Sequence, residues 1–288
     1  MSKVLDDVVT LLALERIEEN LFRGQSQDIG WRMVFGGQVL GQALSAAVQT
    51  VPPERQVHSL HAYFLRPGDV ARPILYAVER LRDGASFTTR GITAVQGGRP
   101  IFTMSASFQA EQDGFDHQDA MPSVPEPEAL QPDRERLTAL AEHIPAGVRH
   151  FALAERPFEF RTVEGHAEAA KPTPRPPHRA IWLRSAGLLP DAPALHRYLL
   201  AYVSDFGFLS TSLLPHGVSW RSPTLRIASL DHAMWFRGPL RVDGWLLYVM
   251  DSPAAHGGRG LVRGRIFSRD GRLVASVAQE GMIRQQAE

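Results

Sequence analysis

The same order of structural elements is predicted twice along this chain of 288 residues. In the first half, a glycine-led apolar helix over residues 36–49 is followed by long strand-like segments. In the second half, an apolar helix over residues 194–214 is followed by a similar series. Alternation such as that of Ile74, Tyr76 and Val78 is typical of strands with one buried face. The repeat indicates two related units within one chain.

The predicted strands form one series in each half. They cover residues 21–26, 57–65, 73–82, 86–96 and 100–110, and then residues 158–162, 179–185, 224–236, 244–251, 260–268 and 272–284. The last two segments are joined by Asp270-Gly271, which is a strong signal for a hairpin turn.

A Pro-rich, polar stretch separates the two series. Because Pro lacks the backbone N–H that a sheet ladder needs, no central strand is expected to pass through this stretch. We therefore expect an N-terminal unit over residues 1–115, a connector over residues 116–150 and a C-terminal unit over residues 151–288.

One long helix wrapped by an antiparallel sheet is the hotdog arrangement. A single unit of this kind leaves a sheet edge exposed, so such units pair. Two units in one chain can pair with each other. The predicted fold class is therefore α+β, a double hotdog in which two helix-wrapped antiparallel sheets join into one continuous sheet. A fold of this kind does not by itself determine the function.

Composition excludes several classes of protein. The chain has no cysteine, so disulfides, thiol catalysis and zinc–thiolate sites are excluded. Its formal net charge is zero, so no general attraction to nucleic acid or to anionic membranes is expected. No His, Asp and Glu residues have the spacing of metal ligands, and we expect neither a metal nor a cofactor.

The N-terminal segment over residues 1–22 has the pattern of an acidic amphipathic helix. It lacks the basic flank and the cleavage site of a signal peptide. No apolar run in the chain approaches the ~20 residues that span a bilayer. These features predict a cytoplasmic protein without a membrane partner.

Asp205 is the first candidate for a functional residue. It follows Tyr202 by three residues and Tyr198 by seven, so it shares the apolar stripe of the predicted helix over residues 194–214. A carboxylate on the core side of a helix is costly unless it is hydrogen-bonded or hydrated. The alternative is a helix cap or a structural Asp that is satisfied in the core.

Gln279 and Ser229 are the other two candidates. By strand alternation, Gln279 shares a face with the apolar residues Ala275 and Val277, so its amide points to the core. Ser229 lies on the predicted strand that follows the helix. A carboxylate, a hydroxyl and an amide on inner faces can hold one water molecule, and the carboxylate can take its proton. Alternatively, each polar group is bonded to neighbouring backbone and is structural.

The first half lacks this set. Its predicted helix has no carboxylate, and Ser107 aligns with Gln279 in the repeat. We therefore expect no catalytic centre in the first half.

Short motifs along the whole chain resemble those of a known protein family. The chain contains, in order, the segments VFGGQV, YFLRPGD, YVSD, LDHAMWF and VAQEG. With further matches between about residue 10 and residue 285, they resemble the acyl-CoA thioesterase II family. Its members are double-hotdog thioesterases of the C/M/P thioester hydrolase group. The resemblance implies hydrolysis of acyl-CoA to free fatty acid and CoA, and a homodimer or homotetramer.

The resemblance also implies roles for individual residues. Asp205 in YVSD would be the general base toward water, while Ser229 in IASLDH and Gln279 in VAQEG would orient that water and steady the oxyanion. The position of Ser229 is commonly Thr in members of this family, and Ser lacks the methyl group that restricts the rotamer of Thr. His58 in VHS is a secondary candidate, with a structural role as the alternative. For His232 in LDHAMWF, packing or a turn contact is expected.

Two other functions stay open. A hotdog enoyl-CoA hydratase would need a nearby Asp–His pair, but the adjacent residues Asp231 and His232 would point to opposite faces of a strand. A non-catalytic module that binds acyl-CoA or an acyl carrier would tolerate loss of the three polar residues. The chain has no G-x-S-x-G segment, which argues against an α/β-hydrolase.

Overall fold

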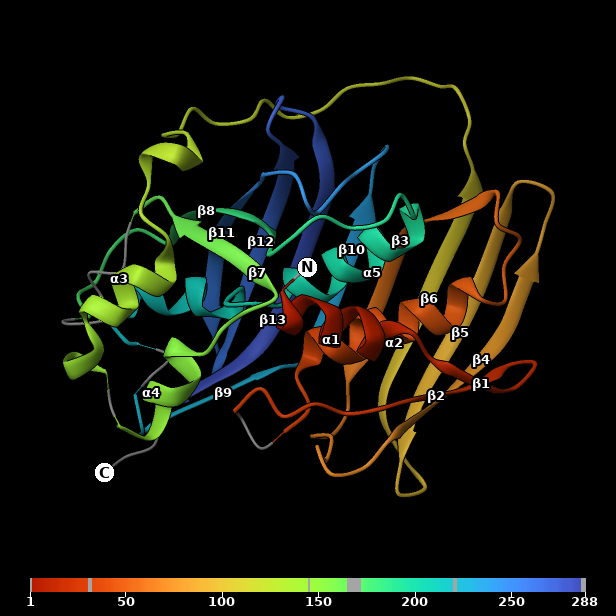
Figure 1. Ribbon diagram of the computed structural model, residues 1–288, viewed down its shortest axis with the longest axis horizontal. Coiled ribbons are helices and arrows are strands. Elements are labelled where there is room, and N and C mark those ends of the chain that lie inside the picture. The colour runs from red at the N-terminus through yellow and green to blue at the C-terminus, as the bar shows by residue number, and fades with distance from the viewer. Residues whose placement is uncertain (1, 31–32, 145, 165–171, 220–221, 286–288) are drawn as a thin grey trace.

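The computed structural model describes residues 2–30, 33–144, 146–164, 172–219 and 222–285 (Figure 1). The α-helices are α1 (Lys3–Leu12), α2 (Gly36–Val48), α3 (Asp133–Ala139), α4 (Ala146–Leu153) and α5 (Pro193–Ser204). The 3₁₀ segments are η1 (Pro127–Ala129), η2 (Ala141–His143) and η4 (Leu209–His216). The strands are β1 (Glu15–Glu18), β2 (Leu21–Gly24), β3 (Arg55–Phe64), β4 (Ile74–Asp83), β5 (Phe87–Gln96), β6 (Arg99–Ala110), β7 (Phe158–Thr162), β8 (His178–Ser185), β9 (Leu225–Ser229), β10 (Asp231–Phe236), β11 (Leu246–His256), β12 (Arg259–Ser268) and β13 (Leu273–Gln285).

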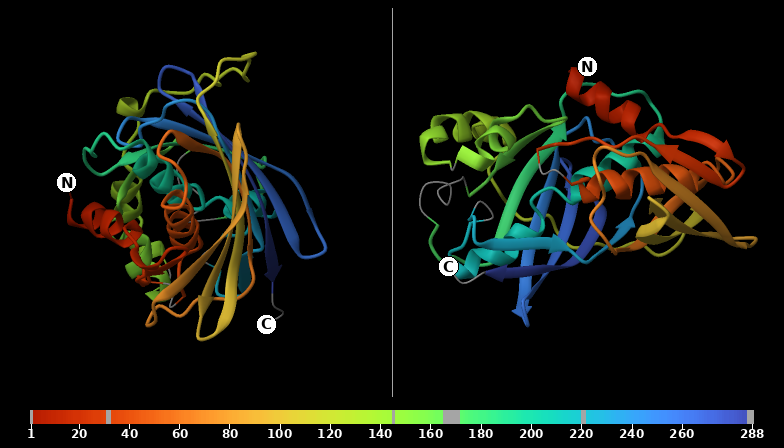
Figure 2. Two further views of the ribbon diagram at one scale, coloured as in Figure 1. Left: turned by 90° about the vertical axis from the view of Figure 1, so that its right-hand side faces the viewer. Right: turned by 90° about the horizontal axis from the view of Figure 1, so that it is seen from below.

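All these strands belong to one antiparallel sheet. Its order is β1-β2-β4-β5-β6-β3 followed by β10-β13-β12-β11-β8-β7, and β9 pairs with β13 off this path. The second series repeats the first in reverse, and the two halves join where β3 pairs with β10. Figure 2 shows the sheet curving around α2 and α5. The predicted double hotdog with one continuous sheet is confirmed.

The N-terminal segment differs from the prediction. Helix α1 ends at Leu12, and the next residues form the hairpin β1–β2, whose second strand pairs with β4 at the edge of the sheet. The hydrogen bonds that the chain gains by pairing with β4 replace those of a longer helix. Tertiary pairing therefore overrides the local helical pattern.

The predicted helix over residues 194–214 is also wrong in its second half. Helix α5 ends at Ser204, and Asp205 is its C-cap residue rather than a mid-helix residue. Gly207 has a φ of 66°, a conformation that L side chains adopt rarely and that commonly ends helices. The chain then continues as η4.

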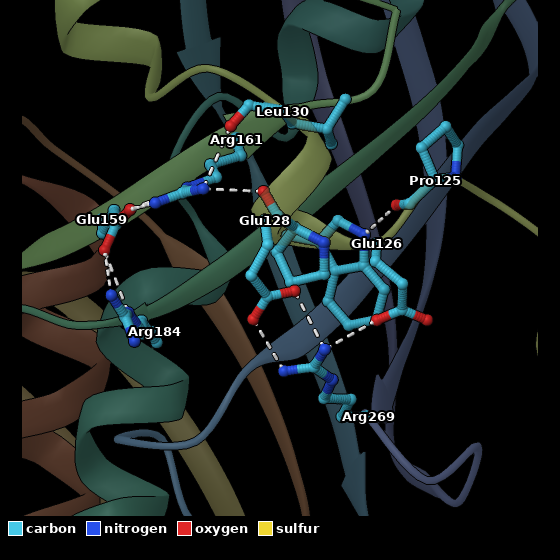
Figure 3. Close-up of polar contacts among 10 residues, drawn as sticks. Pro125, Glu126, Glu128, Leu130, Glu159, Arg161, Arg184 and Arg269 are labelled. Carbon is cyan, nitrogen blue, oxygen red and sulfur yellow. Dashed lines mark hydrogen bonds and ion pairs between the residues drawn. The ribbon is translucent and has the colours of Figure 1, made fainter.

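The segment between β6 and β7 is more than a spacer. It runs along the top of the view in Figure 1 and then forms α3 and α4 beside β7. Figure 3 shows how it is attached to the second half: Arg269 forms ion pairs with Glu126 and Glu128, and Arg161 donates to the Leu130 carbonyl. The predicted connector over residues 116–150 lies within this segment, and its boundaries stay predictions.

Helices α2 and α5 pack against each other in a core that includes residues of both halves. A Cβ atom added to Gly37 would lie 2.1 Å from the Tyr202 carbonyl oxygen, and one added to Gly41 would lie 3.1 Å from that of Tyr198. The two glycines, one helical turn apart on α2, therefore allow α2 to approach the backbone of α5. None of the described helices is long and apolar enough to cross a membrane.

We predict that Gly37→Ala lowers the free energy of unfolding by about 1–3 kcal/mol, because the new methyl group must push the two helices apart. Thermal and urea unfolding of the purified variant measure this effect. The matched control is Gly147→Ala in α4, where an added Cβ meets nothing within 4 Å. That exposed helical position should gain about 0.5–1 kcal/mol. Equal stability of the Gly37 variant and the wild type would contradict the close approach.

Candidate functional site

A cavity of about 1460 Å³ opens in the second half, beside the end of α5. Its walls come from the loop before α2, from α3 and α4, from β7 and β8, and from the turn between α5 and η4. Much of the wall is aromatic, including Phe35, Phe151, Phe158, Phe160 and Phe206. The three predicted residues Asp205, Ser229 and Gln279 also line it. The cavity therefore combines an apolar space with a small polar group, as ligand sites commonly do.

Each of the three polar residues comes from a different element. Asp205 caps α5 at its C-terminus, Ser229 is the last residue of β9, and Gln279 lies on the inner face of β13 with 1% of its surface exposed. The amide of Gln279 donates to the Ser229 hydroxyl, with Nε2 and Oγ 2.7 Å apart. Ser229 Oγ lies 3.4 Å from Asp205 Oδ1, a long hydrogen bond. The fold brings all three predicted residues together.

The Asp205 carboxylate also lies against the N-terminus of α2. It accepts a hydrogen bond from the backbone N–H of Gly37, and a Cβ added to Gly36 would lie 2.6 Å from its Oδ2. Unpaired N–H groups and the helix dipole favour a negative charge at such a position. Glycine at position 36 leaves the space that the carboxylate occupies.

The pKa of Asp205 is raised above its usual range. The cause is burial, which disfavours the charged form, and it outweighs the opposing hydrogen bonds from the Gln279 and Ser229 side chains and from the Gly37 N–H. A carboxylate with a raised pKa is a stronger base than an ordinary Asp. A group of this kind at a cavity is a candidate for acid–base chemistry.

His232 adds a contact that the expected packing role did not include. Its Nδ1 lies 2.6 Å from Gln279 Oε1, and its Nε2 lies 3.0 Å from Ser204 Oγ. Asp231, its neighbour in β10, instead accepts a hydrogen bond from the backbone N–H of Glu280. The sequence contained one signal for this contact, because His232 alternates with the buried Met234 on the inner face of the strand.

His58 lies away from this group. Its Nε2 is 2.8 Å from Ser107 Oγ, and its ring contacts Phe87 at 5.6 Å between centroids. Burial lowers its pKa. It is not among the residues that line the cavity, so the structure does not bring it to Asp205.

The alignment of Ser107 with Gln279 is wrong by one residue. Leu60 pairs with Ala106 and also with Met234, which in turn pairs with Val277, so Ala106 shares the inner face with Val277 and Gln279. Ser107 lies on the opposite face. The inner face of the first half therefore presents the buried apolar residues Ala106 and Phe108 on either side of Ser107.

Over the described part of the chain, no group of three His, Asp or Glu residues is arranged to hold a metal ion. Other charged residues, among them Arg156 and Glu159, also line the cavity, but Asp205 is the carboxylate that lies beside the neutral groups of Ser229 and Gln279. This combination suits proton transfer at a bound water.

Comparisons with known proteins show the family of the chain. A family model described as "Acyl-CoA thioesterase" matches residues 150–282, and one described as "Acyl-CoA thioesterase N-terminal domain" matches residues 23–109. The chain is 43% identical to acyl-CoA thioesterase 2 of Haemophilus influenzae, over 99% of each chain. It is also 43% identical to human acyl-coenzyme A thioesterase 8, over 96% of this chain and 88% of the human protein. Its structure is similar to that of an acyl-CoA thioesterase II from Mycobacterium marinum, with a TM-score of 0.79, 42% identity and 98% coverage of both chains.

We predict that the Asp205 carboxyl titrates above the usual range of an aspartate, and that Ser229→Ala raises its pKa further by removing a donor to the charged form. Carbon-13 NMR of protein labelled at the aspartate carboxyl groups measures both values. Asp243 is the internal control: hydrogen bonds from Arg241 and the Leu189 N–H outweigh its burial and lower its pKa. A pKa of Asp205 at or below that of a solvent-exposed aspartate would contradict the prediction.

Proposed function

The chain belongs to the acyl-CoA thioesterase family, and from this premise we propose that it hydrolyses acyl-CoA thioesters to free fatty acid and CoA. The observation that carries the proposal is the hydrogen-bonded group of Asp205, Ser229 and Gln279 on the wall of the large cavity.

In the proposed mechanism, Asp205 is the general base. A water molecule in the cavity gives a proton to the carboxylate while its oxygen attacks the thioester carbonyl carbon. The tetrahedral intermediate then collapses, the C–S bond breaks, and the proton passes to the leaving sulfur. The products are a carboxylic acid that contains the water oxygen and the free thiol of CoA. The raised pKa of Asp205 suits this role, because it strengthens the base.

Ser229 and Gln279 orient the water and steady the charge on the carbonyl oxygen in this proposal. Both are neutral groups that reach the cavity next to Asp205, and the Gln279 amide donates to the Ser229 hydroxyl. Donors held in place before the reaction stabilise developing negative charge without having to reorganise. The hydrogen bond from Gln279 also restrains Ser229, which lacks the rotamer restriction that a threonine methyl would supply.

The acyl chain is proposed to lie along the aromatic wall. The ring centroids of Phe35 and Phe206 are 4.5 Å apart, and those of Phe160 and Phe206 are 5.8 Å apart, so these side chains form one packed surface next to Asp205. An alkyl chain gains about 0.8 kcal/mol for each CH₂ that it buries. Such a surface therefore favours a fatty acyl group.

The alternative of an enoyl-CoA hydratase is less well supported. It requires Asp231 and His232 to act as a pair, but Asp231 bonds to the Glu280 backbone while His232 bonds to Gln279 and Ser204. A non-catalytic binding module would need no base at the cavity. Release of free thiol from acyl-CoA separates hydrolysis from both alternatives. A cytoplasmic location stays a prediction.

We predict that Asp205→Asn lowers kcat about 10²- to 10⁴-fold with little change in KM, because it removes the base but keeps the shape of the side chain. The burial that raises the pKa of Asp205 favours the protonated form, so the carboxyl stabilises the fold below its unfolded-state pKa. That contribution is lost as the pH rises through its folded-state pKa. At neutral pH the Asn variant should therefore melt at the same or a higher temperature. Thiol release and thermal unfolding measure the two effects.

The matched control is Ser107→Ala in the first half, which should keep near-normal turnover because Ser107 lies on the other face of the sheet. Near-wild-type turnover by well-folded Asp205→Asn would remove Asp205 from the mechanism. A loss in Ser107→Ala as deep as that in the Asp205 variant would contradict the assignment of the centre to the second half.

We also propose that chains associate into a homodimer or homotetramer. Large apolar side chains are exposed on the sheet, among them Tyr63 (62% exposed), Leu81 (51%) and Trp235 (37%). Exposed apolar groups of this kind commonly mark contact surfaces. Light scattering at micromolar concentration should therefore give two or four times the chain mass of 31.9 kDa. A particle of the mass of one chain under these conditions would contradict the proposal.

A further inference from the structure

The hydrogen bonds at the cavity continue inward, away from Asp205. From Ser229 they pass to the Gln279 amide, from its oxygen to Nδ1 of His232, and from Nε2 of His232 to the Ser204 hydroxyl. His232 and Gln279 are each 1% exposed, and Ser204 is fully buried. The inner end of this chain therefore lies in the core, where bulk water does not compete for its hydrogen bonds.

The direction of the Gln279 amide decides what Ser229 can do. With Nε2 toward the cavity, the amide donates to Ser229 Oγ and to the Asp205 carboxylate, and the Ser229 proton stays available to Asp205. If the amide were rotated by half a turn, its oxygen would face Ser229 and accept that proton instead. Asp205 would then lose the donors from both side chains. Only the first orientation supports the group proposed to act on the substrate.

His232 distinguishes between these two orientations. The Gln279 oxygen can only accept a hydrogen bond, so at 2.6 Å the facing Nδ1 must carry a hydrogen. Burial lowers the pKa of His232, which keeps the ring neutral, so Nε2 is then without a hydrogen. Nε2 must accept from the Ser204 hydroxyl 3.0 Å away. A ring with the hydrogen on Nε2 would favour the rotated amide.

Two further contacts hold Ser204 in place for this role. The Tyr248 hydroxyl donates to the Ser204 carbonyl oxygen at 3.1 Å. The Ser204 hydroxyl also donates to the Ala201 carbonyl oxygen 2.9 Å away, so its hydrogen is shared between that carbonyl and Nε2 of His232. Ser204 is the residue before Asp205, so the same helix end holds both the base and the inner end of the hydrogen-bond chain.

We propose that His232 is a positioning residue for the hydrolysis: its Nδ1–H holds the Gln279 amide in the orientation that Ser229 and Asp205 require, and Ser204 selects the tautomer. This inference rests on the proposed thioesterase function. His232 acts through Gln279 and does not line the cavity.

The first test compares His232→Leu with His232→Asn. Loss of the donor in His232→Leu should lower kcat about 10- to 100-fold, the cost of a misplaced catalytic group, with KM within about twofold. His232→Asn should recover part of that loss, because its amide N–H can donate to the Gln279 oxygen. In a Gln279→Ala background, His232→Leu should change kcat by less than about twofold, since residues that act as a unit are not additive.

The matched control is His196→Leu. His196 is also 1% exposed and does not line the cavity, but its ring contacts the Val242 N–H and the Pro190 carbonyl rather than Gln279. Its loss should lower the melting temperature and leave kcat per folded molecule unchanged. If His232→Leu behaves in the same way, or if its effect persists in full in the Gln279→Ala background, the proposal is overturned.

The second test does not depend on turnover. Nitrogen-15 NMR of protein with labelled histidine, assigned by the signal missing from His232→Asn, should show His232 neutral with its hydrogen on Nδ1. Ser204→Ala should shift the ring toward the Nε2–H tautomer. A wild-type ring with its hydrogen on Nε2 would overturn the proposal whether or not the protein hydrolyses thioesters. If the expected tautomer is observed but the protein shows no thioesterase activity, the proposed function is refuted and the tautomer assignment stands.

Discussion

The close contact of α2 with α5 is the constraint on which the rest of the second-half site depends. Gly37 and Gly41 let α2 approach the carbonyl groups of Tyr202 and Tyr198. This approach brings the N-terminus of α2 to the residue that ends α5, so the Gly37 N–H reaches the Asp205 carboxylate. A carboxylate that is partly withdrawn from water is costly without such donors. The packing of two helices from different halves therefore also supplies a hydrogen-bond donor to the Asp205 carboxylate.

Two opposed effects act on the pKa of Asp205. Burial raises its pKa, while hydrogen bonds from the Gln279 and Ser229 side chains and from the Gly37 N–H oppose that rise. Stronger donors would stabilise the carboxylate and make it a weaker base, whereas fewer donors would raise its pKa further. In the observed set the effect of burial prevails, so the pKa stays raised. Such sites are often tuned for activity rather than for stability.

The two halves share a fold but not a site. The strand order is symmetric about the β3–β10 pair, yet the inner face of β6 carries the apolar Ala106 and Phe108 around Ser107, whereas the inner face of β13 carries Gln279. The segment between the halves adds to this difference, because α3 and α4 help to line the cavity of the second half. Salt bridges between Arg269 and two glutamates tie that segment to the second half (Figure 3). The sheet is therefore nearly symmetric, whereas the large cavity lies on the side of the second half.

Alternation along the chain was enough to predict most of the strands, because the direction of successive side chains is a local property of an extended backbone. The segment 158–162 coincides with β7, and Gln279 points inward as expected. The double hotdog followed from the order of these elements.

Contacts between distant segments were decided only by the tertiary structure. A shift of one residue in the repeat alignment placed Ser107 on the wrong face, since each step along a strand reverses the side chain. The end of α5 at Asp205, the donor from α2 and the bond between His232 and Gln279 join elements that are remote in sequence. Their geometry depends on helix packing and strand register, which local periodicity does not contain. The sequence by itself therefore determined which polar side chains face inward, and the packed fold decided which of them meet.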